Sequence, residues 1–223
     1  MKMRALKNII VSFTAAFSMY SRIPMPVIKW TEENIKYTFF FFPFVGAVEG
    51  VIFFFLSRFL AAAGAGTLLA GALLTAFTFL YTGGIHADGF LDVCDALGSY
   101  KEKEERRKIL KDPHVGSAAV ISGIVLCILK TAVYGGAGTL LSLFIALSFF
   151  LSRILSALSI MFFPEAVKEG LAFSFKKAAG KAVKPLLVLL AVSAFGAAFY
   201  LSVKAAVVLI VASVVLFIYQ GTI

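Results

Sequence analysis

Long apolar runs limit what this chain can fold into more than any other feature. Charged residues make up 15% of its 223 residues and hydrophobic residues 61%, well above the roughly 45–50% that is usual for soluble domains. A helix needs about 20 apolar residues to cross a bilayer, and inside the hydrocarbon it satisfies its own backbone hydrogen bonds. Runs of about this length lie at 37–60, 66–82, 115–135, 138–162, 185–200 and 203–220. They predict an all-α, polytopic integral membrane bundle of about six transmembrane helices, a single membrane domain over residues 1–223.

The connections between the runs predict an orientation. The turns at 61–65 and 135–138 carry no charge, whereas 21–36, 83–114 and 163–184 hold most of the lysine and arginine. Basic connections stay on the cytoplasmic side, so these three segments are expected there. The same rule accounts for the net charge of +9, and the sequence contains no nucleic-acid-binding motif.

The N-terminal segment 5–20 is short for a span. Were it a seventh span, Lys2, Arg4 and Lys7 would face outward. Its apolar residues fall in a helical stripe, which predicts an amphipathic helix lying on or dipping into the cytoplasmic interface. The stripe comprises Leu6, Ile9, Ile10, Phe13, Phe17 and Tyr20.

Three aspartates gather in the polar stretch 82–98, TGGIHADGFLDVCDALG. Asp88, Asp92 and Asp95 stand at i, i+4 and i+7, within about 60° of one another on a helix. Carboxylates this close repel, so a divalent cation is the expected partner, and Mg²⁺ prefers such oxygen ligands. One ion could bind here, or two about 4 Å apart that clamp a phosphoryl group. The alternative is a solvated turn at the membrane surface.

Other polar residues surround this acidic cluster. His86 is a general base for an attacking hydroxyl or a hydrogen-bond partner of a cluster aspartate. Asp112 either caps the following helix or adds a metal ligand. His114 either contacts phosphate or is a plain loop histidine. The active-site loop and helix are therefore expected at about 83–114.

A charged helix at 101–111 supplies cations near the cluster. Glu102 with Arg106 and Glu104 with Lys108 are expected as i,i+4 pairs. Cations on this segment can neutralise a pyrophosphate, and arginine does so with a bidentate fork. These candidates are Arg106, Arg107, Lys108 and Lys111.

Two ionisable residues interrupt the apolar runs at depth. Glu49 and Arg153 are costly inside a membrane and are expected to face the bundle interior. They either pair with each other, or Arg153 points towards the phosphate site and binds substrate.

The acidic stretch resembles the signature of the cobalamin-5′-phosphate synthases, the adenosylcobinamide-GDP ribazoletransferases. Supporting elements follow in the family's order over roughly two thirds of the chain. They are SRIPMP at 21–26, FPFVGA at 42–47, RRKILKDPHVG at 106–116 and the Ser152-Arg153 pair. Two positions depart from the family pattern: Ala119 stands where a second glycine is frequent, and Glu49 where residues are commonly apolar or small.

The resemblance implies a reaction. The family transfers the cobinamide phosphate of adenosylcobinamide-GDP onto α-ribazole or its 5′-phosphate, releases GMP and requires Mg²⁺. Enzymes of this family are integral proteins of the bacterial cytoplasmic (inner) membrane and contact the lipid bilayer. Asp88, Asp92 and Asp95 would hold metal and phosphate. Their neighbours would be His86, Arg106, Lys111 and Asp112. A homo-oligomer is compatible with the sequence, which does not set the oligomeric state.

Two other functions remain as alternatives. A CDP-alcohol phosphotransferase making phospholipid would share the chemistry, but Asp88-Gly89 is not followed by that family's Ala-Arg, and its second aspartate pair is missing. A membrane transporter would instead depend on Glu49 and Arg153 and would not need the aspartates.

Overall fold

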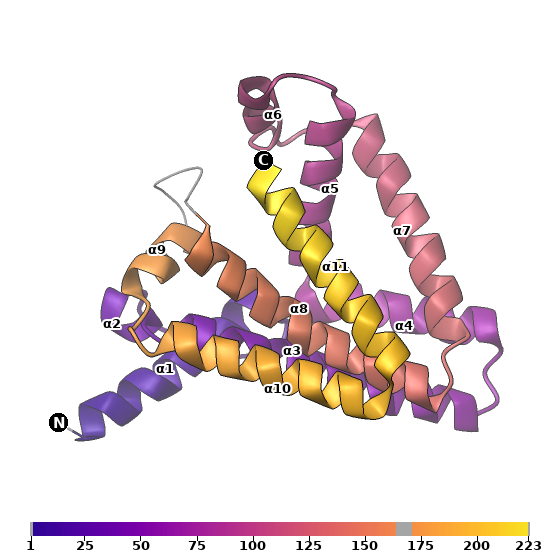
Figure 1. Cartoon of the computed structure of the whole chain (residues 1–223), viewed down its shortest axis with the longest axis horizontal. Coiled ribbons are helices and arrows are strands. Elements are labelled where there is room, and N and C mark those ends of the chain that lie inside the picture. Colours follow the sequence, from indigo (N-terminus) through magenta and orange to yellow (C-terminus); the bar gives the residue numbers. More distant parts are fainter. Residues whose placement is uncertain (1, 164–170, 223) are drawn as a thin grey trace. The chain divides into compact units, whose positions relative to one another are not determined.

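The protein is described from a computed structural model that covers residues 2–163 and 171–222. Within these residues every regular element is a helix, which confirms the all-α prediction (Figure 1). The helices are α1 (Lys2–Tyr20), α2 (Glu32–Ile35), α3 (Thr38–Ala62), α4 (Thr67–Thr82), α5 (Ile85–Gly98), α6 (Lys103–Ile109), α7 (Ser117–Gly135), α8 (Thr139–Phe162), α9 (Leu171–Ala178), α10 (Val183–Leu201) and α11 (Val203–Thr222).

All six predicted apolar runs coincide with helices, as expected for a polytopic membrane protein. In the described part of the chain, four of them (α3, α7, α8 and α10) are each long and apolar enough to cross a bilayer. Helix α4 meets these criteria only together with α5, from which it is bent by 95°. In α11, Ala206–Val215 forms a shorter apolar stretch. The described residues therefore support four or five spans, against about six predicted.

The chain forms two compact units. One comprises Met1–Phe54 with Leu140–Ile223, and the other comprises Phe55–Thr139. A single membrane domain over 1–223 stays a prediction, and each unit is described by itself below.

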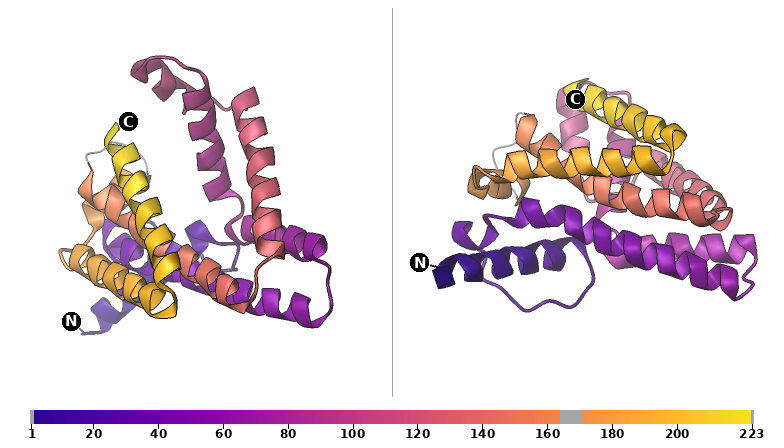
Figure 2. Two further views of the ribbon diagram at one scale, coloured as in Figure 1. Left: turned by 45° about the vertical axis from the view of Figure 1, so that its right-hand side comes forward. Right: turned by 60° about the horizontal axis from the view of Figure 1, so that its bottom comes forward.

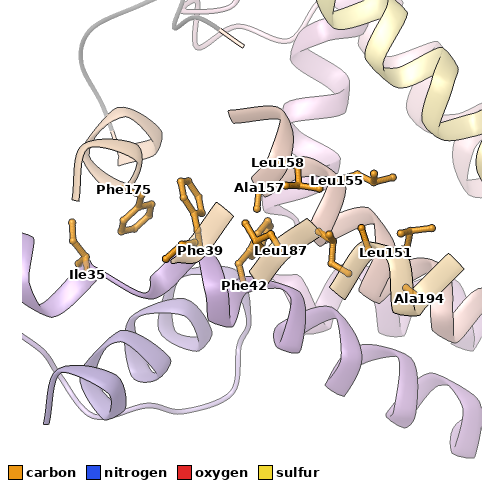
Figure 3. Packing of buried hydrophobic residues seen from close by; sticks show 13 residues of the cluster. Ile35, Phe39, Phe42, Leu151, Leu155, Ala157, Leu158, Phe175, Leu187 and Ala194 are labelled. Atoms are coloured by element: carbon orange, nitrogen blue, oxygen red, sulfur yellow. The ribbon is translucent and has the colours of Figure 1, made fainter. Parts of the chain in front are cut away.

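The first unit is built around aromatic and aliphatic side chains from five helices (Figure 3). Phe39 of α3 meets Phe175 of α9 edge to face, with ring centroids 5.5 Å apart. The other labelled members of the core are Ile35, Phe42, Leu151, Leu155, Ala157, Leu158, Leu187 and Ala194. Helices α3 and α8 approach closely where Gly46 and Gly50 face the backbone carbonyls of Phe149 and Ala146. This small-xxx-small spacing is common where membrane helices pack.

A buried ion pair lies beside this crossing. Arg153 Nη2 donates to Glu49 Oε2 over 2.7 Å, and only 10% and 2% of the two side chains are exposed. Arg153 Nη1 also donates to the hydroxyl of Ser152 over 3.0 Å. The predicted Glu49–Arg153 pairing is therefore confirmed.

Helix α1 packs against α2, and its Phe13 and Tyr20 rings meet Phe41 and Phe42 at the start of α3. Ala15 and Ala16 are fully buried, and the Ser12 hydroxyl donates to the carbonyl of Asn34 over 2.7 Å. The predicted apolar stripe is divided, because Phe17 is buried whereas Ile9 and Ile10 stay exposed. The predicted helix is present, and its position at the membrane interface stays a prediction.

In the second unit, α4 and α7 run antiparallel at close range. A side chain at Gly71 would run into the Thr131 carbonyl oxygen, and one at Gly135 into that of Thr67. Lys130 of α7 donates to the Thr78 hydroxyl of α4 over 2.8 Å. These contacts hold α4 against α7, and α5 and α6 are the helices that connect the two along the chain.

Candidate functional site

Two glycines place the acidic helix. Gly83 and Gly84 both adopt left-handed backbone, with φ of 65° and 83°, and their N–H groups donate to the carbonyls of Leu80 and Phe79. This is the usual way for a helix to end, and it suits glycine because a Cβ would be strained there. The chain then turns sharply and α5 begins at Ile85 (Figure 2).

Helix α5 presents Asp88 and Asp92 to solvent, one turn apart. Both are exposed. Asp88 lies in the first turn, where the helix dipole favours a negative charge. In the described part of the chain, neither carboxylate accepts a hydrogen bond, so their oxygens remain available to a ligand.

Among the described residues, Asp88 is the one charged member of the lining of a cavity of about 640 Å³ in the bend between α4, α5 and α7. The remaining lining is mostly apolar, with Phe79, Leu91 and Leu126 among its members. Small-molecule sites have this character: a largely apolar space with a few polar groups that orient the ligand.

Asp95 is engaged differently from its two neighbours. Its Oδ2 accepts from the N–H of Gly116 over 2.5 Å, and its Oδ1 from the N–H of Ala119 over 2.7 Å. Helix α7 begins at Ser117, and its N-cap residue Gly116 provides no capping side chain. Asp95 therefore caps α7 from another helix, a role that the sequence analysis missed.

The acidic residues suit a metal ion that binds both the protein and the substrate, rather than one held entirely by protein ligands. Among the residues that the structure describes, no group of three or more His, Cys, Asp or Glu side chains converges on one point. Mg²⁺, however, is commonly held by one or two carboxylates, with substrate phosphates and water completing the octahedron. Asp88 and Asp92 supply such a pair. The predicted three-aspartate metal site itself stays a prediction.

Helix α6 carries the predicted cations, but its ion pairs differ from those expected. Arg107 binds Glu104 at 3.3 Å and Lys108 binds Glu105 at 2.6 Å, both at i,i+3. The helix begins only at Lys103, and its extended N-cap residue Glu102 binds Arg106 through the backbone, with the Arg106 N–H donating to the Glu102 carbonyl over 3.0 Å. The predicted Glu102–Arg106 and Glu104–Lys108 pairs were therefore wrong.

Two predicted phosphate-binding cations remain unpaired by acids. In the described part of the chain no carboxylate binds Arg106, which is half-buried, or Lys111, which is exposed. Their positive charge is therefore available to an anion. Their binding of substrate stays a prediction.

The loop before α7 is ordered by Asp112. Its Oδ1 accepts from the backbone N–H of His114 over 3.0 Å and contacts His114 Nδ1 at 2.6 Å. The backbone N–H, followed by the imidazole, lowers the pKa of Asp112 below its ordinary value of 3.8. Asp112 thus shapes its own loop, and Asp95 rather than Asp112 caps the next helix. Both Asp112 and His114 line a smaller pocket of about 310 Å³ next to Asp95.

Two further candidates have clear positions. His86 is half-buried in the first turn of α5, two residues before Asp88. Arg153 belongs to the other unit, where it binds Glu49, and its role towards substrate stays a prediction.

Comparison with known proteins gives this site a family. The model of the family described as cobalamin-5-phosphate synthase matches residues 12–222, nearly the whole chain. The chain belongs to the cobalamin-5-phosphate synthase family. No solved structure matches the chain significantly.

Curated relatives carry a consistent name. An adenosylcobinamide-GDP ribazoletransferase of Lachnoclostridium phytofermentans is 41% identical over 170 residues, which are 76% of this chain and 65% of the relative. Proteins of the same name from Clostridium botulinum (strain Eklund 17B) and Brevibacillus brevis are 36% and 34% identical over 54% and 53% of this chain, and over 48% of each relative. The chain thus spans about half to two thirds of the curated relatives it matches.

Proposed function

We propose that this protein transfers the cobinamide phosphate of adenosylcobinamide-GDP to a free ribose hydroxyl of α-ribazole or α-ribazole 5′-phosphate. Adenosylcobalamin or its 5′-phosphate forms, and GMP leaves. Membership of the family and the name shared by the curated relatives support this reaction. The observation that carries the proposal is the exposed carboxylate pair of Asp88 and Asp92 beside a cavity of ligand size.

The reaction requires positioning and charge compensation more than covalent chemistry. The acceptor hydroxyl oxygen forms a bond to the phosphorus that carries cobinamide, and the bond from that phosphorus to the bridging oxygen breaks. GMP departs with the electron pair, and the hydroxyl proton passes to a base. His86 in the first turn of α5 is the candidate for that base.

Cations of the chain would bind the pyrophosphate. Arg106 suits a phosphate because its planar guanidinium can donate two parallel hydrogen bonds, and Lys111 adds a mobile point charge. Asp88 and Asp92 would hold Mg²⁺, which when bound supplies further positive charge to the phosphate oxygens. The basic segment 83–114 would face the cytoplasm of a bacterial cytoplasmic membrane, where the phosphorylated substrates are dissolved.

Turnover by purified protein tests the proposal. The enzyme in detergent receives adenosylcobinamide-GDP, α-ribazole and Mg²⁺, and GMP is quantified by chromatography. We expect GMP release to depend on both α-ribazole and Mg²⁺, and to fall by about 100-fold or more in Asp92→Asn, because a positioned charge next to the phosphates is lost.

The matched control is Glu102→Gln, which neutralises an exposed carboxylate outside α5. It should retain wild-type turnover. An Asp92→Asn variant as fast as wild type would refute the role given to this carboxylate. Release of GMP without α-ribazole would point to a hydrolase instead.

A further inference from the structure

Asp95 fastens two helices of the second unit together. Its carboxylate accepts hydrogen bonds from Gly116 and Ala119, which stand 21 and 24 residues further along the chain. The N–H groups of a first helical turn have no partner within their own helix and are usually satisfied by a side chain just before it. Here the acceptor comes from α5, so capping α7 and holding α5 against it are one interaction.

The seam between α5 and α7 is tight from the C-terminal end of α5 back to Leu91. A Cβ at Gly98 would lie 2.5 Å from the Cβ of Ala118, and one at Gly123 would lie 3.1 Å from Leu91. A Cβ at Gly116 would lie 2.6 Å from Asp95 Oδ1. The C-terminal end of α5 lies beside the start of α7 in Figure 1 and in the left view of Figure 2. Glycines at these three points allow an approach that other residues would prevent.

A metal-binding role for Asp95 would disturb this seam. Both carboxylate oxygens already accept backbone N–H groups, and Ala119, which donates one of them, is 1% exposed. Turning the carboxylate towards an ion shared with Asp88 and Asp92 would weaken these bonds at a buried donor, which is unfavourable.

We infer that Asp95 is a positioning residue that locks α5 against the N-terminus of α7 and so fixes where Asp88 and Asp92 point, rather than a ligand of the metal. Small displacements of reacting groups are costly: about 1 Å can reduce a rate by about 100-fold. The effect on turnover rests on the proposed function, whereas the effect on the helix seam does not.

Two variants separate capping from positioning. Asp95→Ala removes the cap and the tie between the helices. Asp95→Ala combined with Gly116→Asp gives α7 a cap of its own, because Gly116 has extended backbone (φ −88°, ψ 171°) that suits an N-cap residue. The Asp95 truncation also clears the space that a side chain at residue 116 needs. The double variant therefore restores the N-terminal cap of α7 without restoring the hydrogen-bonded link between α5 and α7.

The rate at which Cys94 is alkylated reports how firmly α5 packs against α7, and it needs no enzyme assay. Cys94 is a free, half-buried thiol on α5, and Cys127→Ser removes the exposed second thiol. In that background we expect maleimide to modify Cys94 about tenfold faster in both Asp95 variants, because the local opening of α5 becomes easier. The thermal midpoint should fall in Asp95→Ala and return in the double variant. A Cys94 rate that returns to the parental value in the double variant overturns the inference, because Asp95 would then only cap α7.

Manganese binding tests the alternative role as a ligand. We expect the Mn²⁺ dissociation constant, measured by electron paramagnetic resonance, to change by less than about twofold in the double variant and to rise by about tenfold or more in Asp92→Asn. GMP release should stay reduced by about 10–100-fold in the double variant, at unchanged KM for α-ribazole. Loss of Mn²⁺ in the double variant to the same degree as in Asp92→Asn would make Asp95 a ligand. Absence of turnover in the parent enzyme would refute the proposed function and leave the Cys94 result to decide the role of Asp95.

Discussion

Removing the Glu49 side chain tests how much the buried Glu49–Arg153 ion pair stabilises the first unit. Glu49→Ala leaves the Arg153 guanidinium, 10% exposed, without the carboxylate that it binds at 2.7 Å. Breaking one partner of a buried pair costs about 3–5 kcal/mol, because the remaining buried charge loses the carboxylate that balances it. The Ser152 hydroxyl, which accepts from Arg153 Nη1 over 3.0 Å, is neutral and does not replace the lost carboxylate charge.

This free energy corresponds to a large change in thermal stability. For a chain of this size, 1 kcal/mol shifts the unfolding midpoint by about 2–4 °C, so Glu49→Ala should lower it by about 6–20 °C. The single tryptophan of the chain, Trp30, lies in the same unit, with its ring 6.3 Å from that of Phe175. Its fluorescence in detergent therefore follows the unfolding of this unit.

A double substitution is the control. Glu49→Leu with Arg153→Met removes both charges, and replacing a buried pair by apolar residues is often neutral or stabilising. We expect its midpoint to lie near that of the wild type. The reasoning is refuted if Glu49→Ala unfolds within about 2 °C of the wild type, or if the double variant is as unstable as the single one.

Three further outcomes follow from the second unit. Gly71→Ala should destabilise the protein by about 1–3 kcal/mol because its Cβ meets the Thr131 carbonyl, whereas Gly66→Ala, with open space around it, should change the unfolding midpoint little. Arg58→Ala should cost about 0.5–1.5 kcal/mol, read from the same midpoint, because the hydrogen bonds from its guanidinium to the Thr139 hydroxyl and the Ala137 carbonyl are lost. For Asp112, whose pKa is lowered in the folded protein, the stabilisation by His114 is present above pH 3.8 and is lost as the pH falls through the lower, folded pKa. A carbon-13 titration of Asp112 should give a midpoint below 3.8, and His114→Ala should raise it only in part because the backbone N–H remains.

Much of the fold follows from local patterns in the sequence. Sustained apolar runs predict α3, α7, α8 and α10, because a helix is the structure that hides its backbone from lipid. The Gly83–Gly84 pair predicts the break before α5, because only glycine adopts left-handed backbone without strain. The Glu49–Arg153 pair was also predictable, since few other partners exist at that depth.

The role of Asp95 could not be derived in the same way. Its spacing places it on one face with Asp88 and Asp92, but the spacing says nothing about which helix lies opposite. The decisive contact joins Asp95 to Gly116 across 21 residues, and only tertiary packing creates it. One signal was available: Gly116 precedes a long apolar run that has no capping side chain of its own, so an acceptor had to come from elsewhere.

Anomalous scattering from Mn²⁺ tests the central claim most directly. Crystals of the full chain soaked with Mn²⁺ and GMP should give a peak within about 2.5 Å of carboxylate oxygens of both Asp88 and Asp92, as expected for a divalent ion bound by oxygen ligands. The peak should disappear in Asp92→Asn. No peak at α5 in the wild type, or a peak held by other residues that survives this substitution, would contradict the account.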